Sequence, residues 1–158
     1  MADEKTNVMR LLEQNKIPYT PRQYDVSDGA LDGVTAAQRL GVPLETCFKT
    51  LVTVGSSKRN YVVVVPSDKE LDLKAAAKAV GEKSIEMIKQ AQLLPLTGYI
   101  HGGCSPVGMK KRFPTVIDDS AQALAEMTVS AGKIGRQVTL KPDDLAAFVG
   151  AEFVPVSK

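Results

Sequence analysis

Short runs of β-branched and aliphatic residues alternate along the chain with segments whose apolar residues recur at helical spacing. The clearest runs are residues 47–55 (CFKTLVTVG) and 60–66 (NYVVVVP), which are separated only by the polar stretch SSKR. Two β-rich runs with so short a polar connection predict a β-hairpin. The same pattern predicts further strands or extended segments at 19–26, 83–88, 97–103, 115–118, 127–130, 137–141 and 152–156.

Helices are predicted where a capping residue precedes an apolar pattern of helical period. Asp3 or Thr6 is a suitable N-cap for a first helix that ends before Pro18. Asp72 is the expected cap of a helix over 71–81, which ends at a glycine. The other helices are expected at 35–40, at 89–94 with Pro95 as the stop, at 120–126 and at 142–150.

The predicted strands and helices follow one another in no regular order. A hairpin contains antiparallel strands, and therefore the sheet cannot be wholly parallel. We predict an α+β (mixed α/β) fold, with a mixed, partly closed β-barrel or sheet flanked by helices. The 158 residues correspond to one domain, 1–158, which is long enough to bury a core.

Composition narrows the classes of protein. With 44% hydrophobic and 24% charged residues, the chain is typical of a folded globular protein. No apolar run is long enough for a membrane span and the polar N-terminus lacks signal-peptide features, so we expect no membrane association and a cytoplasmic location. Cys47, Cys104 and the one histidine, His101, show no metal-ligand spacing, so neither a metal nor another cofactor is expected. A Ser-His-Asp or Cys-His site is also disfavoured, because His101 would have to be its base.

Lys49 is the first candidate for chemistry. On an alternating strand it shares a face with Cys47 and Leu51, and both faces of residues 47–55 are largely apolar. An ammonium group on a covered face is costly unless it is paired, reaches solvent or lines a cavity. Two interpretations follow: Lys49 reaches solvent from the strand end, or it belongs to a binding site.

The segment 98–112 (GYIHGGCSPVGMKKR) is the second candidate. Gly102 and Gly103 permit positive φ and the close approach of a ligand or of another backbone, and Ser105 adds a hydroxyl group. The N–H groups of such a loop can form a concavity for an anion or a carbonyl oxygen. A tight turn between two strands is the alternative interpretation.

Cations gather around this loop and in a later segment, 129–135 (VSAGKIG), which contains Ser130. This later segment is interpreted either as a turn between strands or as a phosphate-binding site. The net charge of +2 neither requires nor excludes a nucleic acid as partner. A solvated surface is the simple interpretation of these cations. If tRNA is bound, the candidate phosphate contacts are Lys110, Lys111, Arg112, Lys133 and Arg136.

These segments together resemble a known family. An early tyrosine is followed by FKTL, then by GY-x-x-GG-x-SP-x-G-x-KK, and then by VS-x-GK-x-G. The combination is similar to that of the YbaK/EbsC family, which is related to the editing domain of bacterial prolyl-tRNA synthetases, and the resemblance covers nearly the whole chain. It implies a mixed, β-barrel-like sheet flanked by helices and the hydrolysis of mischarged aminoacyl-tRNA, which in the YbaK branch is Cys-tRNA(Pro).

The resemblance also implies roles for single residues. Lys49 corresponds to the essential lysine of the family, and Gly102 to the glycine that approaches the substrate carbonyl. Gly103 is expected to add a second backbone donor for the oxyanion, and Ser105 to contribute to substrate binding.

The amino-acid pocket is implied by other matching positions. Ser130 corresponds to the pocket serine, and Tyr24 aligns best with the early pocket tyrosine, with Tyr19 as the alternative. An aromatic residue is common in the family where this chain has Leu31 or Asp32, so the shape of the pocket is expected to differ at that place.

The implied reaction is substrate-assisted. The thiol of a cysteinyl ester attacks its own carbonyl, so that a cyclic thiolactone forms and the tRNA is freed without a general base from the protein. Lys49 holds the terminal ribose or phosphate, or adds positive charge near the ester. The expected partners are the acceptor end of tRNA(Pro) and prolyl-tRNA synthetase. The alternatives are a deacylase for another residue, such as alanine on the same tRNA, and a non-catalytic module that binds aminoacyl-tRNA or a synthetase.

Overall fold

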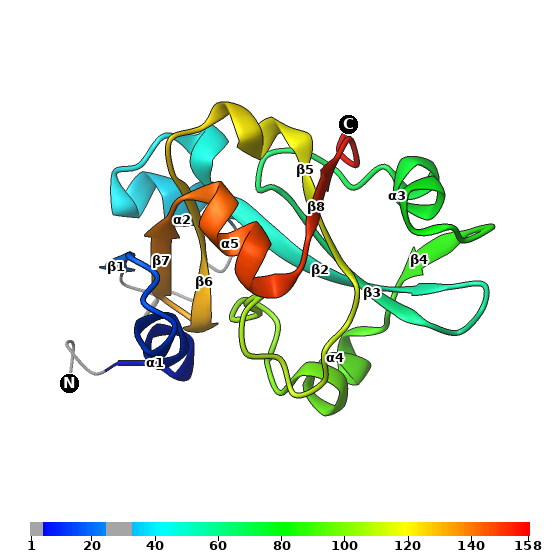
Figure 1. The fold of residues 1–158 in the computed structure, drawn as a ribbon, viewed down its shortest axis with the longest axis horizontal. Coiled ribbons are helices and arrows are strands. Elements are labelled where there is room, and N and C mark those ends of the chain that lie inside the picture. Colours follow the sequence, from blue (N-terminus) through cyan, green and yellow to red (C-terminus); the bar gives the residue numbers. More distant parts are fainter. Residues whose placement is uncertain (1–4, 25–32) are drawn as a thin grey trace.

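The computed structural model describes residues 5–24 and 33–158 (Figure 1). Its strands form a five-stranded sheet of order β4-β2-β3-β5-β8 and a three-stranded sheet of order β1-β7-β6. The strands are β1 (Thr20–Gln23), β2 (Phe48–Gly55), β3 (Asn60–Pro66), β4 (Ile85–Met87), β5 (Thr115–Asp118), β6 (Met127–Lys133), β7 (Arg136–Leu140) and β8 (Glu152–Val154).

The predicted hairpin is confirmed. β2 and β3 pair antiparallel from Phe48 opposite Pro66 to Val54 opposite Asn60. β5 then pairs parallel with β3, and β8 parallel with β5, so the larger sheet is mixed. The parallel part is possible because helical connections, and not tight turns, lead into β5 and β8.

The two sheets meet at the start of β2. An isolated parallel bridge joins Cys47 to Thr128 of β6, and this contact closes one side of a barrel whose other side stays open. Helices pack outside, with α5 across the open side, α1 under β6 and β7, and α3 beside β4 (Figure 1). The predicted mixed, partly closed sheet with flanking helices is therefore confirmed.

The helices begin and end largely where capping chemistry places them. The predicted caps of α1 and α3 are confirmed, because Thr6 Oγ1 accepts a hydrogen bond from the Met9 N–H and Asp72 Oδ1 accepts one from the Ala75 N–H. The helices are α1 (Asn7–Gln14), α2 (Gly33–Leu40), α3 (Leu73–Val80), α4 (Gln90–Thr97), α5 (Pro142–Val149) and the 3₁₀ turns η1 (Leu44–Thr46) and η2 (Asp119–Ala123). No helix in the described ranges is both long and apolar enough to cross a bilayer.

Among the residues that the structure describes, two apolar clusters form the core, one on each face of the β2–β3 hairpin. On one face, Phe48 and Val52 pack with Val64 and with residues of β5, β6, β7 and α5. On the other face, Val63 and Val65 pack against the alanines of α3. The period-2 pattern of the sequence assigns successive residues to the two clusters in turn.

Three predicted elements were wrong, and one of them is the helix expected at 120–126, where the structure has the 3₁₀ turn η2. Pro95 does not stop α4, which continues for two more residues to Thr97, since a proline in the last turn of a short helix removes only one backbone hydrogen bond. The segment 97–103, predicted to be a strand, forms the end of α4 and a turn instead. It cannot add to the sheet because Gly98, at φ +83°, caps α4 with its N–H bonded to the Leu94 carbonyl.

Candidate active site

A cavity of about 470 Å³ runs along one edge of β2. Six consecutive residues from 47 to 52 line it, so both faces of the strand contribute. A strand borders a cavity with both faces only if the cavity lies beside its edge. The lining residues are Tyr24, Ala36, Cys47, Phe48, Lys49, Thr50, Leu51, Val52, Ser67, Met87, Ile88, Gln90, Leu93, His101, Gly102, Cys104, Ser130 and Gln137.

The cavity exists because the sheet is incomplete at this edge. β4 pairs with β2 only from Thr53 to Gly55, and β6 reaches it only at the Cys47–Thr128 bridge. Between these two contacts no described strand pairs with β2. α4 and the loop that follows it form the opposite wall, through Gln90, Leu93 and Gly102.

Lys49 lies on the β2 side of the cavity and is half-buried. Its position opposite Val65 in the hairpin fixes the backbone that carries it. The single ion pair among the described residues joins Lys5 and Glu13, so Lys49 has no acidic partner in that part of the chain. Of the described residues that line the cavity none is acidic, and hence the ammonium gives the cavity a positive potential that favours an anion or an oxyanion.

Gly102 borders the same cavity, opposite β2. Its φ of +88° is in the left-handed region, which a glycine adopts without strain. Exposed His101 precedes it and also lines the cavity. The structure thus places Lys49 and Gly102, the first glycine of the loop, at the same cavity, as predicted. Their roles remain predictions.

Gly103 does not meet the expectation of a second donor to the oxyanion. Its N–H donates to the Ile100 carbonyl oxygen at 3.0 Å, and Gly103 is not among the lining residues. The residue is buried against the turn that follows β6. Gly103 shapes the loop, and its N–H is already used.

Ser105 is also placed elsewhere than predicted. It is fully buried, and its Oγ accepts a hydrogen bond from the Val107 N–H at 3.2 Å. Such a serine stabilises the turn of its own loop. Since Ser105 does not line the cavity, the predicted contact with the substrate is not supported by its position.

Ser130 and Tyr24 do line the cavity. Ser130 Oγ accepts from the Gly132 N–H at 3.1 Å, which leaves its own proton available to a ligand. Tyr24 is held by its N–H, which donates to the Gly135 carbonyl at 3.0 Å. Tyr19, the alternative, instead donates its hydroxyl proton to Glu13 Oε2 of α1 at 2.9 Å. Leu31 and Asp32 lie outside the described residues.

The two cysteines of the cavity are poor nucleophiles. Burial raises the pKa of Cys47 to about 11, although the positive charge of Arg22 partly opposes the shift. Burial raises the pKa of Cys104 to about 12. Both thiols are free and protonated near neutral pH, so neither provides a thiolate for attack on a substrate.

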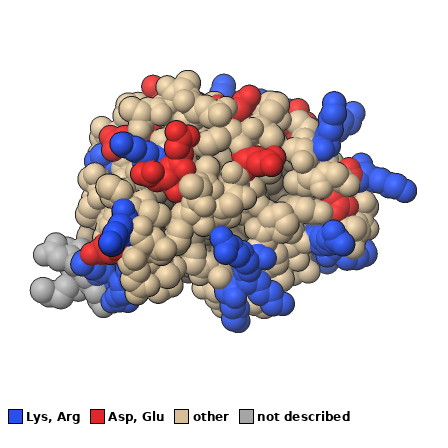
Figure 2. Space-filling view, viewed as in Figure 1, with Lys and Arg blue, Asp and Glu red and all other residues tan. Residues whose placement is uncertain are grey.

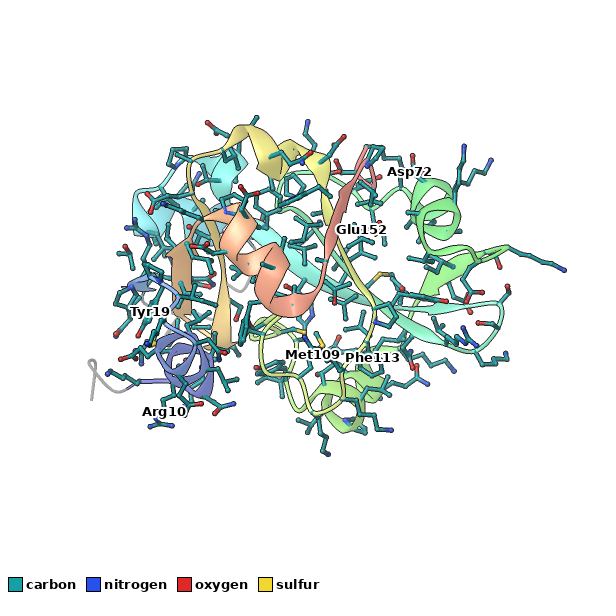
Figure 3. The ribbon with its side chains drawn as sticks, viewed as in Figure 1. Arg10, Tyr19, Asp72, Met109, Phe113 and Glu152 are labelled. Carbon is teal, nitrogen blue, oxygen red and sulfur yellow. The ribbon has the colours of Figure 1, made fainter. Side chains whose placement is uncertain are left out.

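The predicted tRNA contacts fall into two groups that do not line this cavity. Lys110, Lys111 and Arg112 border a second cavity of about 370 Å³ beside α1 and α5, with Met109 and Phe113 (Figure 3). Lys133 and Arg136 belong to the β6–β7 turn, where Lys133 is exposed and Arg136 half-buried. This turn packs on the glycine loop next to the first cavity.

Several cavity residues were not singled out in the sequence. Thr50, Ser67, Gln90 and Gln137 bring polar groups to the wall from four separate elements or loops. No local pattern marks them, because their meeting depends on the open edge of β2. Among the residues that the structure describes, no three of the His, Cys, Asp and Glu side chains lie close enough together to hold a metal ion.

A family model, the aminoacyl-tRNA editing domain, matches residues 30–148. The chain therefore belongs to the family of aminoacyl-tRNA editing domains, and the resemblance inferred from the motifs is confirmed.

Individual relatives agree with this assignment. EbsC of Enterococcus faecalis (strain ATCC 700802 / V583), whose name assigns it as a Cys-tRNA(Pro)/Cys-tRNA(Cys) deacylase, is 44% identical over 156 residues, which cover 99% of this chain and 95% of EbsC. The proline–tRNA ligase of Ralstonia pickettii (strain 12J) is 27% identical over 101 residues, or 61% of this chain and 18% of the ligase.

Solved structures share the fold. The protein APE2540 superposes with a TM-score of 0.88 at 22% identity, over 97% of this chain and all of the other. A protein described as a trans-editing enzyme for prolyl-tRNA synthetase superposes with a TM-score of 0.83 at 23% identity, over 98% of this chain and 99% of the other. At these identities the likeness concerns the fold alone.

Proposed function

We propose that this protein is a trans-editing deacylase that frees tRNA from a mischarged amino acid, with Cys-tRNA(Pro) as its principal substrate. The observation that carries the proposal is the cavity at the edge of β2. There Lys49, which has no ion pair within the described part of the chain, faces a wall that contains Gly102 and no described acid. Membership of the editing-domain family and the likeness to EbsC support the same activity.

The reaction needs little chemistry from the protein. The substrate thiol sulfur attacks the ester carbonyl carbon, the bond from that carbon to the ribose oxygen breaks, and the proton of the thiol ends on the ribose hydroxyl. The product is a thiolactone, which water opens later. A free thiol has a pKa of about 8.5, and the positive charge of Lys49 favours its ionised form and the oxyanion that develops at the carbonyl.

The face beside the cavity suits an RNA strand. Between Glu86 and Asp118 the sequence contains no acidic residue, and this segment forms α4 and the loop with Gly102. Figure 2 shows Lys and Arg side chains gathered without acids where Figure 1 places α4 and its following loop. The rim after Ser67 instead carries exposed Asp68 and Glu70. Phosphates are attracted more strongly to the first rim than to the second, where exposed Lys69 lies between the two acids.

A deacylation panel tests the proposal. Cys-tRNA(Pro), Ser-tRNA(Pro) and Ala-tRNA(Pro) are incubated with the protein, with and without prolyl-tRNA synthetase. We expect rapid loss of cysteine and much slower loss of serine, since a hydroxyl is a far weaker nucleophile than a thiol. Equal rates on cysteine and serine would exclude the thiol mechanism. A preference for alanine would identify the alternative deacylase, and tight tRNA binding without turnover would identify a non-catalytic module.

A further inference from the structure

On the side that borders the cavity, the backbone of Thr50 has no pairing partner among the described strands. In an antiparallel hairpin, successive residues direct their N–H and C=O groups to opposite sides of the strand. Gly55 donates its N–H to the Arg59 carbonyl oxygen across the hairpin, so the odd-numbered residues of β2 face β3. The even-numbered residues face the other way, as the bond from the Ile88 N–H to the Val52 carbonyl oxygen confirms.

Thr50 lies between the two places where this edge is covered. β4 and its extension reach the edge as far as Val52, and β6 reaches it at Cys47. Thr50 lines the cavity, and no described strand offers partners to its N–H and C=O. Its Oγ1 is shielded from solvent and also lacks a hydrogen-bond partner among the described residues. Buried polar groups without partners are rare in proteins and call for an explanation.

An aminoacyl ester has hydrogen-bonding groups that complement the N–H and C=O groups at this edge of β2. Its α-ammonium group is a donor and its carbonyl oxygen an acceptor, separated by one Cα, as in one residue of a β-strand. Extended ligands bind to open sheet edges through such main-chain hydrogen bonds. The open part of the edge is about one residue long, which excludes a longer peptide but fits a single aminoacyl group.

We propose that the aminoacyl group of the substrate binds as a one-residue strand beside β2, with the Thr50 N–H donating to the ester carbonyl oxygen and the Thr50 C=O accepting from the α-ammonium group. This inference rests on the proposed function and names the contact that holds the reacting ester. The Thr50 N–H provides the donor that Gly103, bonded to Ile100, does not. The free amino group is then a requirement for rapid cleavage.

Two measurements test this contact. The first uses the protein unchanged and compares Cys-tRNA(Pro) with 3-mercaptopropionyl-tRNA(Pro), which keeps the thiol and the ester but lacks the amino group. We expect kcat/KM to fall at least 10-fold for the deaminated substrate. Equal values would overturn the proposal. The value for Cys-tRNA(Pro) tests the proposed function separately, because absence of cleavage there contradicts the activity itself.

The second measurement removes only the backbone donor. Incorporation of the α-hydroxy acid of threonine at position 50 replaces its N–H by an oxygen atom and keeps the side chain. We expect kcat/KM on Cys-tRNA(Pro) to fall about 10-fold or more, with little change in the unfolding midpoint. The same exchange at Thr53, whose N–H faces β3 and which does not line the cavity, is the matched control and should lower the unfolding midpoint more. Full activity of the exchanged position 50 would overturn the proposal.

Discussion

Gly103 and Ile134 are in close backbone contact, and this contact fixes the glycine loop beside the β6–β7 turn. A Cβ atom on Gly103 would lie 3.2 Å from the Ile134 nitrogen and 3.3 Å from the carbonyl carbon of Lys133. Both neighbours are main-chain atoms that a rotamer change cannot move. The second glycine of the pair is therefore required for packing, whereas the first one borders the cavity.

Replacement of this glycine should displace the loop. We expect Gly103→Ala to lower the free energy of unfolding by about 1–3 kcal/mol through overpacking and to lower kcat/KM, because Gly102 moves with the loop. Thermal unfolding and the Cys-tRNA(Pro) assay measure the two effects. Gly150→Ala is the control: its φ of +70° strains an alanine, but nothing lies within 4 Å of the new Cβ. A loss of stability in both variants with a loss of activity in Gly103→Ala alone is the expected pattern.

Removal of the cavity ammonium should abolish activity and leave the fold intact. Lys49 is half-buried and has no ion pair within the described ranges, so Lys49→Met keeps the apolar stem and loses only the charge. We expect kcat/KM to fall by about 100-fold or more, the scale seen when one electrostatic stabiliser is removed from a reacting carbonyl. The melting temperature should change little. Activity that survives in Lys49→Met would mean that the side chain only reaches solvent.

Cations next to α4 should contribute to affinity for tRNA. The Lys110 N–H donates to the Thr97 carbonyl oxygen at 2.9 Å, which fixes this part of the loop at the end of α4. We expect Lys110→Gln with Lys111→Gln to weaken tRNA binding. The slope of log K against log salt should become shallower by about one unit for each phosphate that the variant no longer binds.

The salt titration needs a control of equal charge. Lys74→Gln with Lys78→Gln removes two exposed cations from α3, which packs on the other face of the hairpin. The control pair should leave the slope unchanged. Equal reductions in both double variants would show that binding responds to net charge and not to this face.

The buried carboxylate of Asp118 should make the free energy of unfolding depend on pH. Burial alone raises the pKa of Asp118, but hydrogen bonds from Ser120, Val156 and Ser157 outweigh it and lower the pKa below its ordinary value. Its Oδ1 accepts from the N–H groups of Val156 and Ser157, each at 3.0 Å. Because the pKa is lowered on folding, the stabilisation is fully present above the ordinary pKa of about 4 and is lost as pH falls through the lowered value.

Asp118→Asn measures this contribution. At pH 7 we expect the variant to lose about 2–3 kcal/mol of unfolding free energy, since hydrogen bonds to a charged acceptor are replaced by weaker ones. At pH 3, below the ordinary pKa, the difference from the unchanged protein should be smaller, because the unfolded chain binds a proton at this carboxyl group there and the advantage of the folded carboxylate falls. Urea unfolding at the two pH values gives both numbers. A difference that stays constant between pH 7 and pH 3 would contradict the assignment.

The sequence was informative where structure depends on neighbours in the chain. The β2–β3 hairpin, the caps Thr6 and Asp72 and the glycine loop follow from local patterns, and all are present. The predicted stop at Pro95 was wrong because a short helix tolerates one missing bond. Ser105 was predicted at the substrate because its hydroxyl lies in the right loop, but that hydroxyl points into its own turn.

The sequence by itself determined which segments supply the site, because an ammonium in an apolar strand and a paired glycine are visible without a fold. Only the tertiary structure decided which of their atoms are available. β4 and β6 leave β2 uncovered around Thr50, and Ile100 engages the N–H of Gly103 while Gly102 stays at the cavity. The physical reason is that a backbone donor or acceptor can be satisfied by a segment far away in the chain. Local sequence patterns do not predict such long-range hydrogen bonds.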